Sequence, residues 1–509
     1  MDEIDRVKED VWHGRIDAER LVTLIVTLQG RLDEAVRELE AAKRRIAELE
    51  QQSGPTASMK VDQPFSMRAE EKRQEARGKT KRRKNRPIRR GRVTTAEKVR
   101  QAARTEKVFP ADVPQSACQL SHTRPVWRLE NGRAVLVAYQ VYRGPKNQFG
   151  KIPGVLGRSE FGIEIVIAVA YLVYVVGLSF DKVCLLLNFF QNLRLRKSQA
   201  DALLHQLSRH WSGEFERLCT LLANSAVVHA DETSWSIHSV WAFLSEKARV
   251  LFFGVHKDAK TLQEILNPAT FGGIVISDDA AVYANFTHSQ KCWAHLLRKA
   301  IKLTLLEPAN AEFRRLTDRL LEIYRRACRV QRDQRLSAAG RERKVVELDD
   351  EIMELCGGVW FADLPKGVGA DDDYRLLCNE LTSLMLDREL FAFVTAAPVT
   401  APQGVTQPVA GTNNEAERTL RGAAMARKTG RTNKTPVGAR RQTIIVSVLE
   451  SLRNYLASFT LTTVIAEITR WFETGRSCYA ELADNLGLPT TSTATAPSVL
   501  DRLLPGPSG

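Results

Sequence analysis

The chain has 509 residues, enough for three or four modules of ordinary size, and its 44% hydrophobic content supports real cores. The formal net charge of +14 is concentrated in one place, because residues 72–92 hold twelve Lys or Arg and one Glu. Eight scattered cysteines without a CxxC pair exclude a disulfide framework, and the longest apolar run, residues 165–178, is too short to span a membrane. The charged N-terminus has no apolar signal core, so we expect a soluble protein of a reducing cytoplasm.

Residues 1–53 are dominated by a heptad repeat. Ile25, Leu32, Leu39 and Ile46 lie seven residues apart, with further apolar residues at the other seam position. This pattern predicts a two-stranded coiled coil, and therefore a homodimer or higher oligomer. The alternative is one amphipathic helix that packs on its own protein.

Residues 54–110 are rich in Gln, Ser, Pro, Lys and Arg and are predicted to form a mobile basic tether. A compact basic block of this kind indicates a polyanionic partner, usually nucleic acid. The residues that we expect to contact DNA here are Lys81, Arg82, Arg83, Lys84, Arg89 and Arg90. The alternative is a solvated linker without a ligand.

The segment 111–157 is predicted to be small and β-rich, with a hairpin over 125–143 that turns at Asn131-Gly132. The segment 158–222 is predicted to be helical and to begin with a buried helix over 165–178.

Two short helices then flank the turn NLRLR, the second starting at Ser198 as N-cap, which fits a helix-turn-helix. Lys197 and Ser198 would then contact DNA. The alternative is that the two helices only pack against each other and do not bind DNA.

After residue 222 the sequence pattern changes to alternating strands and helices. Three strands, a helix and a fourth strand are predicted within 223–277. The remaining boundaries expected from composition are a core segment 223–305, a helical insertion 306–400, a second core segment 401–450 and C-terminal helices with a disordered tail 451–509.

Acidic residues end the first and fourth of these strands. The first carries Asp231 and Glu232, and the fourth is followed by Asp278 and Asp279. In a ribonuclease H-like sheet these strands are neighbours, and adjacent carboxylates are kept together mainly to bind hard cations. A third acid is expected from the helix that starts near Asn413 or Asn414. An acid at a strand end is more often structural, and the residues alone do not select one acid from each pair.

Three stretches carry a resemblance to a known family: HADETSW, SDDAAVYANF with KCWAHLLRKA, and TNNEAERTLRGAAMARKTG. Together they resemble the insertion sequence 66 family of bacterial transposases, over roughly residues 160–485. The resemblance implies a multidomain, mainly α protein with an α/β ribonuclease H-like catalytic core, interrupted by a helical insertion and preceded by a coiled coil.

The resemblance also selects among the acids. Asp278 lies five residues before Tyr283 and Glu417 lies in the AER triplet, as the family pattern requires, and Asp231 is chosen on the same basis. These three residues are the implied catalytic and metal-binding set, with two Mg²⁺ or Mn²⁺ ions per site. The candidate phosphate contacts beside them are Arg418, Arg421, Arg427 and Lys428.

Trp235, Cys292 and His295 are expected to support the site, although a packed Cys and a capping His would explain the latter two equally well. Family members commonly have a cysteine-rich segment near the N-terminus, but only Cys118 and His122 are present here, so we expect no zinc.

The implied function is a DNA transposase that binds element ends, cleaves them in a metal-dependent reaction and joins the 3′ end to target DNA. Its partners would be double-stranded DNA, a second copy of the chain and small accessory proteins encoded beside it, without a membrane, in the bacterial cytoplasm at the nucleoid. The alternatives are a catalytically silent DNA-binding protein derived from a transposase and a ribonuclease H-like structure-specific nuclease.

Overall fold

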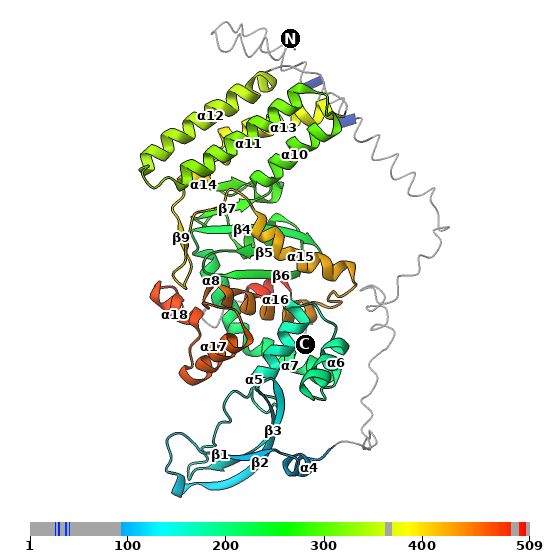
Figure 1. Ribbon diagram of the computed structural model, residues 1–509, viewed down its shortest axis with the longest axis vertical. Coiled ribbons are helices and arrows are strands. Elements are labelled where there is room, and N and C mark those ends of the chain that lie inside the picture. The colour runs from blue at the N-terminus through cyan, green and yellow to red at the C-terminus, as the bar shows by residue number, and fades with distance from the viewer. Residues whose placement is uncertain are drawn as a thin grey trace, which may run out of the picture. The chain divides into compact units, whose positions relative to one another are not determined.

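The computed structural model describes residues 93–361, 369–489 and 498–504, together with six isolated positions between 26 and 40. The predicted coiled coil, apart from those six positions, and the basic segment 72–92 lie outside the described residues, so both stay predictions. The described residues form a mixed α/β protein with three sheets (Figure 1). No helix among them is long and apolar enough to cross a membrane.

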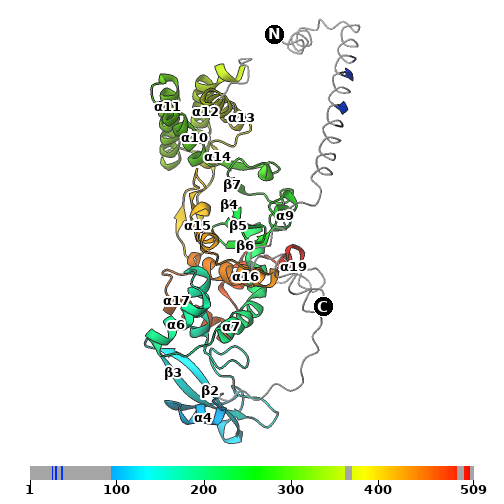
Figure 2. The same cartoon turned by 90° about the vertical axis from the view of Figure 1, so that its right-hand side faces the viewer.

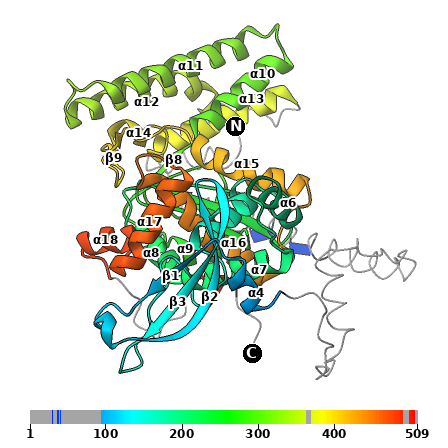
Figure 3. The ribbon, with the colours of Figure 1, turned by 60° about the horizontal axis from the view of Figure 1, so that its bottom comes forward.

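The predicted hairpin is confirmed and belongs to a three-stranded sheet. β2 (Gln119–Glu130) and β3 (Arg133–Arg143) pair antiparallel across Asn131 and Gly132, whose φ angles of 47° and 74° match the left-handed turn that such a dipeptide favours. β1 (Arg104–Val108) adds to β3 in parallel, as the lower part of Figure 3 shows.

The expected boundary of the tether at residue 110 is therefore wrong. Residues 95–108 form ordered structure, because α4 (Thr95–Arg100) begins at the Thr94 N-cap and β1 completes the sheet.

Four helices follow the small sheet. Their bounds are α5 (Ile163–Ala170), α6 (Phe180–Gln191), α7 (Lys197–His210) and α8 (Ser212–Ala223), and a π-helical turn over Tyr171–Val175 extends α5. The helix pair expected around NLRLR is present as α6 and α7. The predicted Ser198 N-cap is wrong, because the N-cap is Arg196 and α7 begins at Lys197. Gln199 Oε1 accepts the Arg196 backbone N–H at 3.0 Å and so satisfies a helix start two positions earlier.

The central sheet has the strand order β6-β5-β4-β7-β8. Its elements are β4 (Val227–Ser234), β5 (Ser239–Leu244), β6 (Arg249–Val255), α9 (Ala259–Ile265), β7 (Ile274–Ser277) and β8 (Ser289–Lys291). β4, β5 and β6 form an antiparallel meander, while β7 pairs in parallel with β4 and β8 in parallel with β7. The prediction that the first and fourth strands are neighbours is thus confirmed.

The expected helical insertion is present after β8. Its helices are α10 (Trp293–Leu306), α11 (Ala311–Arg332), α12 (Ala338–Phe361), α13 (Ala370–Leu386) and α14 (Ala392–Thr395), seen together in Figure 2. One hydrophobic core continues from the sheet residues Val227 and Ile276 through Trp293 into the buried faces of these helices. The insertion is therefore packed onto the sheet rather than tethered to it.

The chain then returns to the sheet. After two short strands, β9 (Val399–Thr400) and β10 (Thr406–Gln407), come α15 (Asn414–Lys428), α16 (Pro436–Ser451), α17 (Leu461–Thr474), α18 (Cys478–Asn485) and α19 (Val499–Leu503). α15 packs against β4 and β5, whereas α16 lies along β6 (Figure 1). The stretch TSTATAPS, residues 491–498, was predicted to be disordered and lies outside the described residues except for Ser498, which is the N-cap of α19.

α16 covers the open edge of β6 by hydrogen bonding. The hydroxyls of Thr443, Ser447 and Ser451 each accept a backbone N–H of β6 at 2.9 Å, from Phe253, Leu251 and Arg249 respectively. One helical turn of four residues advances about 6 Å and two strand residues advance about 6.6 Å, so the two ladders stay in step. An edge that could otherwise pair with another chain is closed in this way.

Candidate active site

Two aspartates meet where β4 and β7 lie side by side. The parallel register pairs Val227 with Ile274 and His229 with Ile276, so continuing it by two residues sets Asp231 opposite Asp278. Asp278 directly follows the last residue of β7, and its Oδ1 accepts the Ala280 backbone N–H at 3.2 Å.

Asp231 is half-buried beside other acids. Burial, and after it the negative charges of Glu232, Asp278 and Glu417, raise the pKa of Asp231 from 3.8 to about 7, although the Glu232 backbone N–H donates to Oδ1 at 2.9 Å. The influence of Asp278 and Glu417 on this group means that three carboxylates from three separate elements share one electrostatic environment.

Glu232 has a different environment. Its carboxylate is only 2% exposed, accepts the Tyr283 hydroxyl at 2.5 Å and pairs with Lys257 Nζ at 2.5 Å. Tyr283 is fully buried against Trp241, so this contact fastens the turn that follows Asp278 onto β4. Glu232 therefore has a structural role, and Asp231 is the member of the pair that is left without a cationic partner among the described residues.

The two glutamates of α15 both pair with arginines, but they turn toward different elements. Glu415 pairs with Arg249 of β6, and this cation, opposing the effect of burial, lowers the pKa of Glu415. Glu417 turns instead toward α10, where Arg298 Nη2 donates to both of its oxygens at 2.8 and 3.1 Å.

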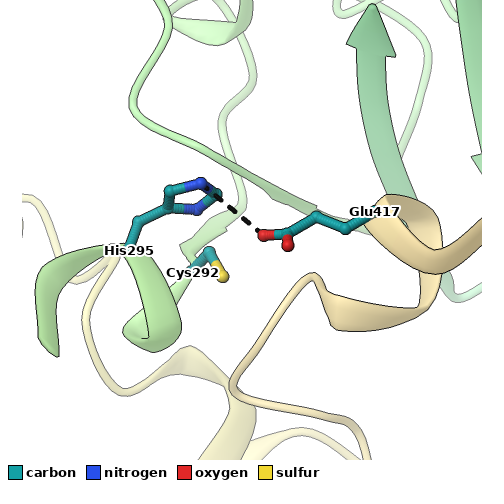
Figure 4. A group of neighbouring side chains, drawn as sticks. All are labelled: Cys292, His295 and Glu417. Atoms are coloured by element: carbon teal, nitrogen blue, oxygen red, sulfur yellow. Dashed lines mark ion pairs between the residues drawn. The ribbon is translucent and has the colours of Figure 1, made fainter. Parts of the chain in front are cut away.

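Cys292 and His295 lie beside Glu417 (Figure 4). The His295 ring points at the carboxylate, with Nε2 3.6 Å from Oε1, and the ligand atoms of all three residues lie within 4.8 Å of one another. Asp278, Asp279, Cys292 and His295 also line a cavity of about 280 Å³. The site-supporting position expected for Cys292 and His295 is thus consistent with their location.

A hydrogen-bonded clamp, formed by Cys292 and Asn413, holds the start of α15 against the sheet. Cys292 Sγ accepts the Asn413 backbone N–H at 3.1 Å, and Asn413 Nδ2 donates to Ala230 O at 2.7 Å. Burial raises the pKa of Cys292, which keeps the thiol neutral. Asn413 occupies the expected N-cap position, but its side chain binds β4 instead of capping the helix. The clamp therefore ties α15, which carries Glu417, to the strand residue directly before Asp231.

The basic residues expected to contact phosphates differ in their surroundings. Arg418, Arg421 and Lys428 are exposed on α15, whereas Arg427 Nη1 donates to Ser234 O at 2.8 Å and so joins α15 to the end of β4. No acidic residue occurs from 418 to 449, so this band is uniformly basic in sequence.

The other predicted site residues lie elsewhere. Lys197 and Ser198 are exposed at the start of α7, where Lys197 pairs with Asp181 at 3.0 Å. Trp235 is buried against Phe253, which is a packing role at the end of β4. The predicted contacts between Lys81 and Arg90 lie outside the described residues.

Lys257 and Arg298 were missed by sequence reasoning, and Asn413 was expected only at the start of a helix. Each contacts a partner that is distant in sequence. Arg298 and Glu417, for example, are 119 residues apart, so no local sequence pattern predicts the contact. The sequence features near these contacts that pointed to a site were the AER triplet and the position of Asn413 at the start of a helix.

Chemically, three convergent carboxylates are oxygen ligands that suit a hard divalent cation. The raised pKa of Asp231 fits this use, because a cation would offset the repulsion that opposes its ionisation. Cys292, His295 and Glu417 are also close enough to contact one ion, but the Cys292 thiol is buried and neutral, and a thiol binds metal as the thiolate.

Comparison with known proteins agrees with this chemistry. No curated protein matches the chain. A family model described as the transposase IS66 family matches residues 158–441, more than half of the chain, and this range contains all three acidic stretches and the helical insertion. Members of this family act on DNA and typically use divalent metal. The chain belongs to the IS66 family of transposases.

Proposed function

We propose that this chain is a DDE-type DNA transposase whose metal ligands are Asp231, Asp278 and Glu417. The observation that carries the proposal is the parallel register of β4 and β7, which sets two aspartates side by side, with Glu417 near enough to perturb the pKa of Asp231. Glu232 is taken up by Tyr283 and Lys257, whereas Asp231 has no cationic partner among the described residues, and Glu417 would have to leave Arg298 to bind an ion.

The strand arrangement supports a ribonuclease H-like core. An antiparallel meander β4-β5-β6 is extended on the β4 side by two parallel strands, in the order β6-β5-β4-β7-β8. α15 brings the third acid across the sheet after an insertion of about one hundred residues. That topology agrees with the fold expected from the family resemblance.

The three carboxylates would hold two Mg²⁺ or Mn²⁺ ions. When bound, such ions activate the attacking oxygen and stabilise the leaving oxygen of a phosphodiester. Asp231 and Asp278 would face both ions, and Glu417, released from Arg298, would hold one of them. The role of the clamp is to keep Glu417 in reach of both aspartates.

Two reactions follow at this site. Water attacks the phosphorus at the element end and breaks the P–O3′ bond, which leaves a 3′-hydroxyl and a 5′-phosphate. The 3′-hydroxyl then attacks a phosphodiester of the target, forms a new bond to its 5′-phosphate and releases the target 3′-hydroxyl. Neither step forms a bond between protein and DNA.

DNA would be held by the predicted basic residues. Arg418, Arg421 and Lys428 are exposed on the helix that carries Glu417, while the segment 72–92 and the α6–α7 pair would bind element ends. The heptad repeat would bring two copies together.

The test combines DNA bearing the inverted repeats that flank the reading frame with the purified full-length protein and Mn²⁺. Nicking at the repeat end and joining to a second DNA are expected, and both should be lost in Asp231→Asn, Asp278→Asn and Glu417→Gln with DNA affinity retained. Asp279→Asn is the matched control, because Asp279 is exposed next to Asp278. Binding without nicking in the native protein would favour the silent DNA-binding protein, and cleavage without joining would favour the nuclease.

A further inference from the structure

The helical insertion carries a basic surface that the catalytic proposal does not use. α11 contains seven arginines and three acids, and its last ten residues, 323–332, contain four arginines and no acid. Its neighbours are acidic: α12 has three basic and six acidic residues, and α13 has one and four. α10 is basic as well, but its Arg298, Lys299 and Lys302 pair with Glu417, Glu380 and Asp373. The end of α11 therefore differs from α10 in carrying basic residues that have no acid beside them on their own helix.

The arginines of α11 fall into two groups. Arg319 and Arg326 both pair with Glu351 of α12, so they hold the two helices together. Arg325, Arg329 and Arg332 are exposed, and within the described part of the chain none of them has an ion pair. Spacings of four and three residues set these three side chains on one face of the helix, over about 10 Å. We call them the arginine stripe.

The stripe is held rigidly. On the opposite face of α11, Ile323 and Ala327 are buried, and Tyr324 stacks on Trp293 with ring centroids 5.2 Å apart. Gln331 Nε2 donates to Phe393 O at 2.7 Å and to Val409 O at 2.5 Å. The backbone that carries the three arginines is thus fixed by a packed helix, which lowers the backbone entropy lost on binding a partner.

The stripe is also connected to the candidate active site. Trp293 follows Cys292 directly, and its backbone N–H donates to Gly411 O at 3.0 Å, two residues before Asn413 of the clamp. The same packed segment therefore supports Glu417 on one side and α11 on the other.

We propose that the arginine stripe binds backbone phosphates of duplex DNA, so that the helical insertion is a DNA-binding surface. The partner follows from the charge of the stripe and from the transposase family, and the proposal does not need the catalytic roles assigned above. A length of about 10 Å covers roughly three phosphates of one strand, at 3.4 Å of helix axis for each. Arginine suits this contact, since its planar fork binds phosphate oxygens in pairs. The acidic α12 and α13 would repel DNA and so direct it to the stripe.

The test is the salt dependence of duplex binding by full-length protein, measured by fluorescence anisotropy in EDTA, where no cleavage occurs. The triple variant Arg325→Gln, Arg329→Gln, Arg332→Gln should lower the slope of log Kd against log salt by about 2.7, at about 0.9 for each phosphate contact. Between 50 and 200 mM salt, native affinity should then fall about 40-fold more than that of the variant. The triple Lys variant keeps the charges, so its slope should match the native one.

The matched control replaces Arg315, Arg343 and Lys344 by Gln, which removes the same charge from the same insertion but away from the stripe. Its slope should stay native. An unchanged slope in the stripe variant, or an equal decrease in the control, overturns the proposal. A stripe variant that changes the oligomeric state and leaves the slope unchanged would assign the surface to a second copy instead. Thermal unfolding like that of the native protein is expected for both variants, because none of the six side chains is buried. Loss of cleavage alone would bear on the catalytic proposal and not on this one.

Discussion

Replacing Asp231 by Asn should stabilise the metal-free protein, and the gain should grow with pH. The folded chain raises the pKa of Asp231 from 3.8 to about 7, first through burial and then through the neighbouring carboxylates. Between these two values the unfolded chain has lost the proton that the folded chain still holds. Stability therefore falls as pH rises from about 4 through 7, and the full cost is present above pH 7.

The magnitude follows from the two pKa values. At 1.36 kcal/mol for each pH unit, the cost at pH 8 is about 4 kcal/mol, and at pH 5 it is about 2 kcal/mol. Asn has the shape of the carboxyl group and no charge, so Asp231→Asn removes this cost at both pH values. Its advantage over the native chain should thus be about 2 kcal/mol larger at pH 8 than at pH 5.

Urea unfolding in EDTA at the two pH values measures this difference. Asp279→Asn is the control and should change neither value, because Asp279 is exposed. Saturating Mg²⁺ should stabilise the native chain at pH 8 but leave the Asn variant nearly unaffected, since bound ligand stabilises only the state that binds it. An advantage that does not depend on pH, or an equal response of both proteins to Mg²⁺, would refute the reasoning.

Three further predictions address the site and the fold. Asn413→Ala should lower kcat for strand cleavage about 10- to 100-fold with DNA Kd unchanged, because it removes the hydrogen bond to Ala230 O that ties the start of α15, and with it Glu417, to β4. An equal loss of binding would mean general misfolding. Ser447→Ala should lower the free energy of unfolding by about 1–3 kcal/mol, because the buried Leu251 N–H loses its acceptor. Ser447→Thr, which keeps the hydroxyl, is the comparison. An Ala variant with an unchanged free energy of unfolding would show that another group replaces the acceptor. Deleting residues 72–92 should flatten the salt dependence of DNA binding, since fewer counterions are released; an unchanged slope would make the segment a linker.

Several elements were predictable because their causes are local. The hairpin turn needs positive φ at two successive residues, and Asn131-Gly132 supplies it without a partner elsewhere. The helices of the insertion follow from apolar residues at helical spacing, as in α11, where Leu316, Leu320 and Ile323 are buried. The start of α7 shows the limit of such reasoning, because a Gln side chain three residues into the helix moved the boundary away from Ser198.

Which acid of each adjacent pair belongs to the site does not follow from its neighbours in sequence. Asp231 and Glu232 have the same neighbours in sequence, and only the arrival of Tyr283 and Lys257 distinguishes them. Glu415 and Glu417 each pair with an arginine, Arg249 and Arg298 respectively, so ion pairing does not separate them, and only the direction in which each side chain turns does. Family resemblance made the selection from the sequence, and for Glu232 the tertiary contacts add a physical reason.

The sequence by itself determined most of the strands, helices and turns after residue 119, and which stretches carry acids, because hydrophobic period and turn chemistry act over a few residues. It did not predict α4, β1 or the short strand β8. Only the tertiary structure decided that β4 lies beside β7, that α16 closes the edge of β6 with three hydroxyls, and that Cys292 and Asn413 fasten α15 to the sheet. These contacts join residues that are between 47 and about 200 positions apart in the sequence, so they form only when distant parts of the chain fold together. The acids in the sequence become a candidate metal site only through that packing.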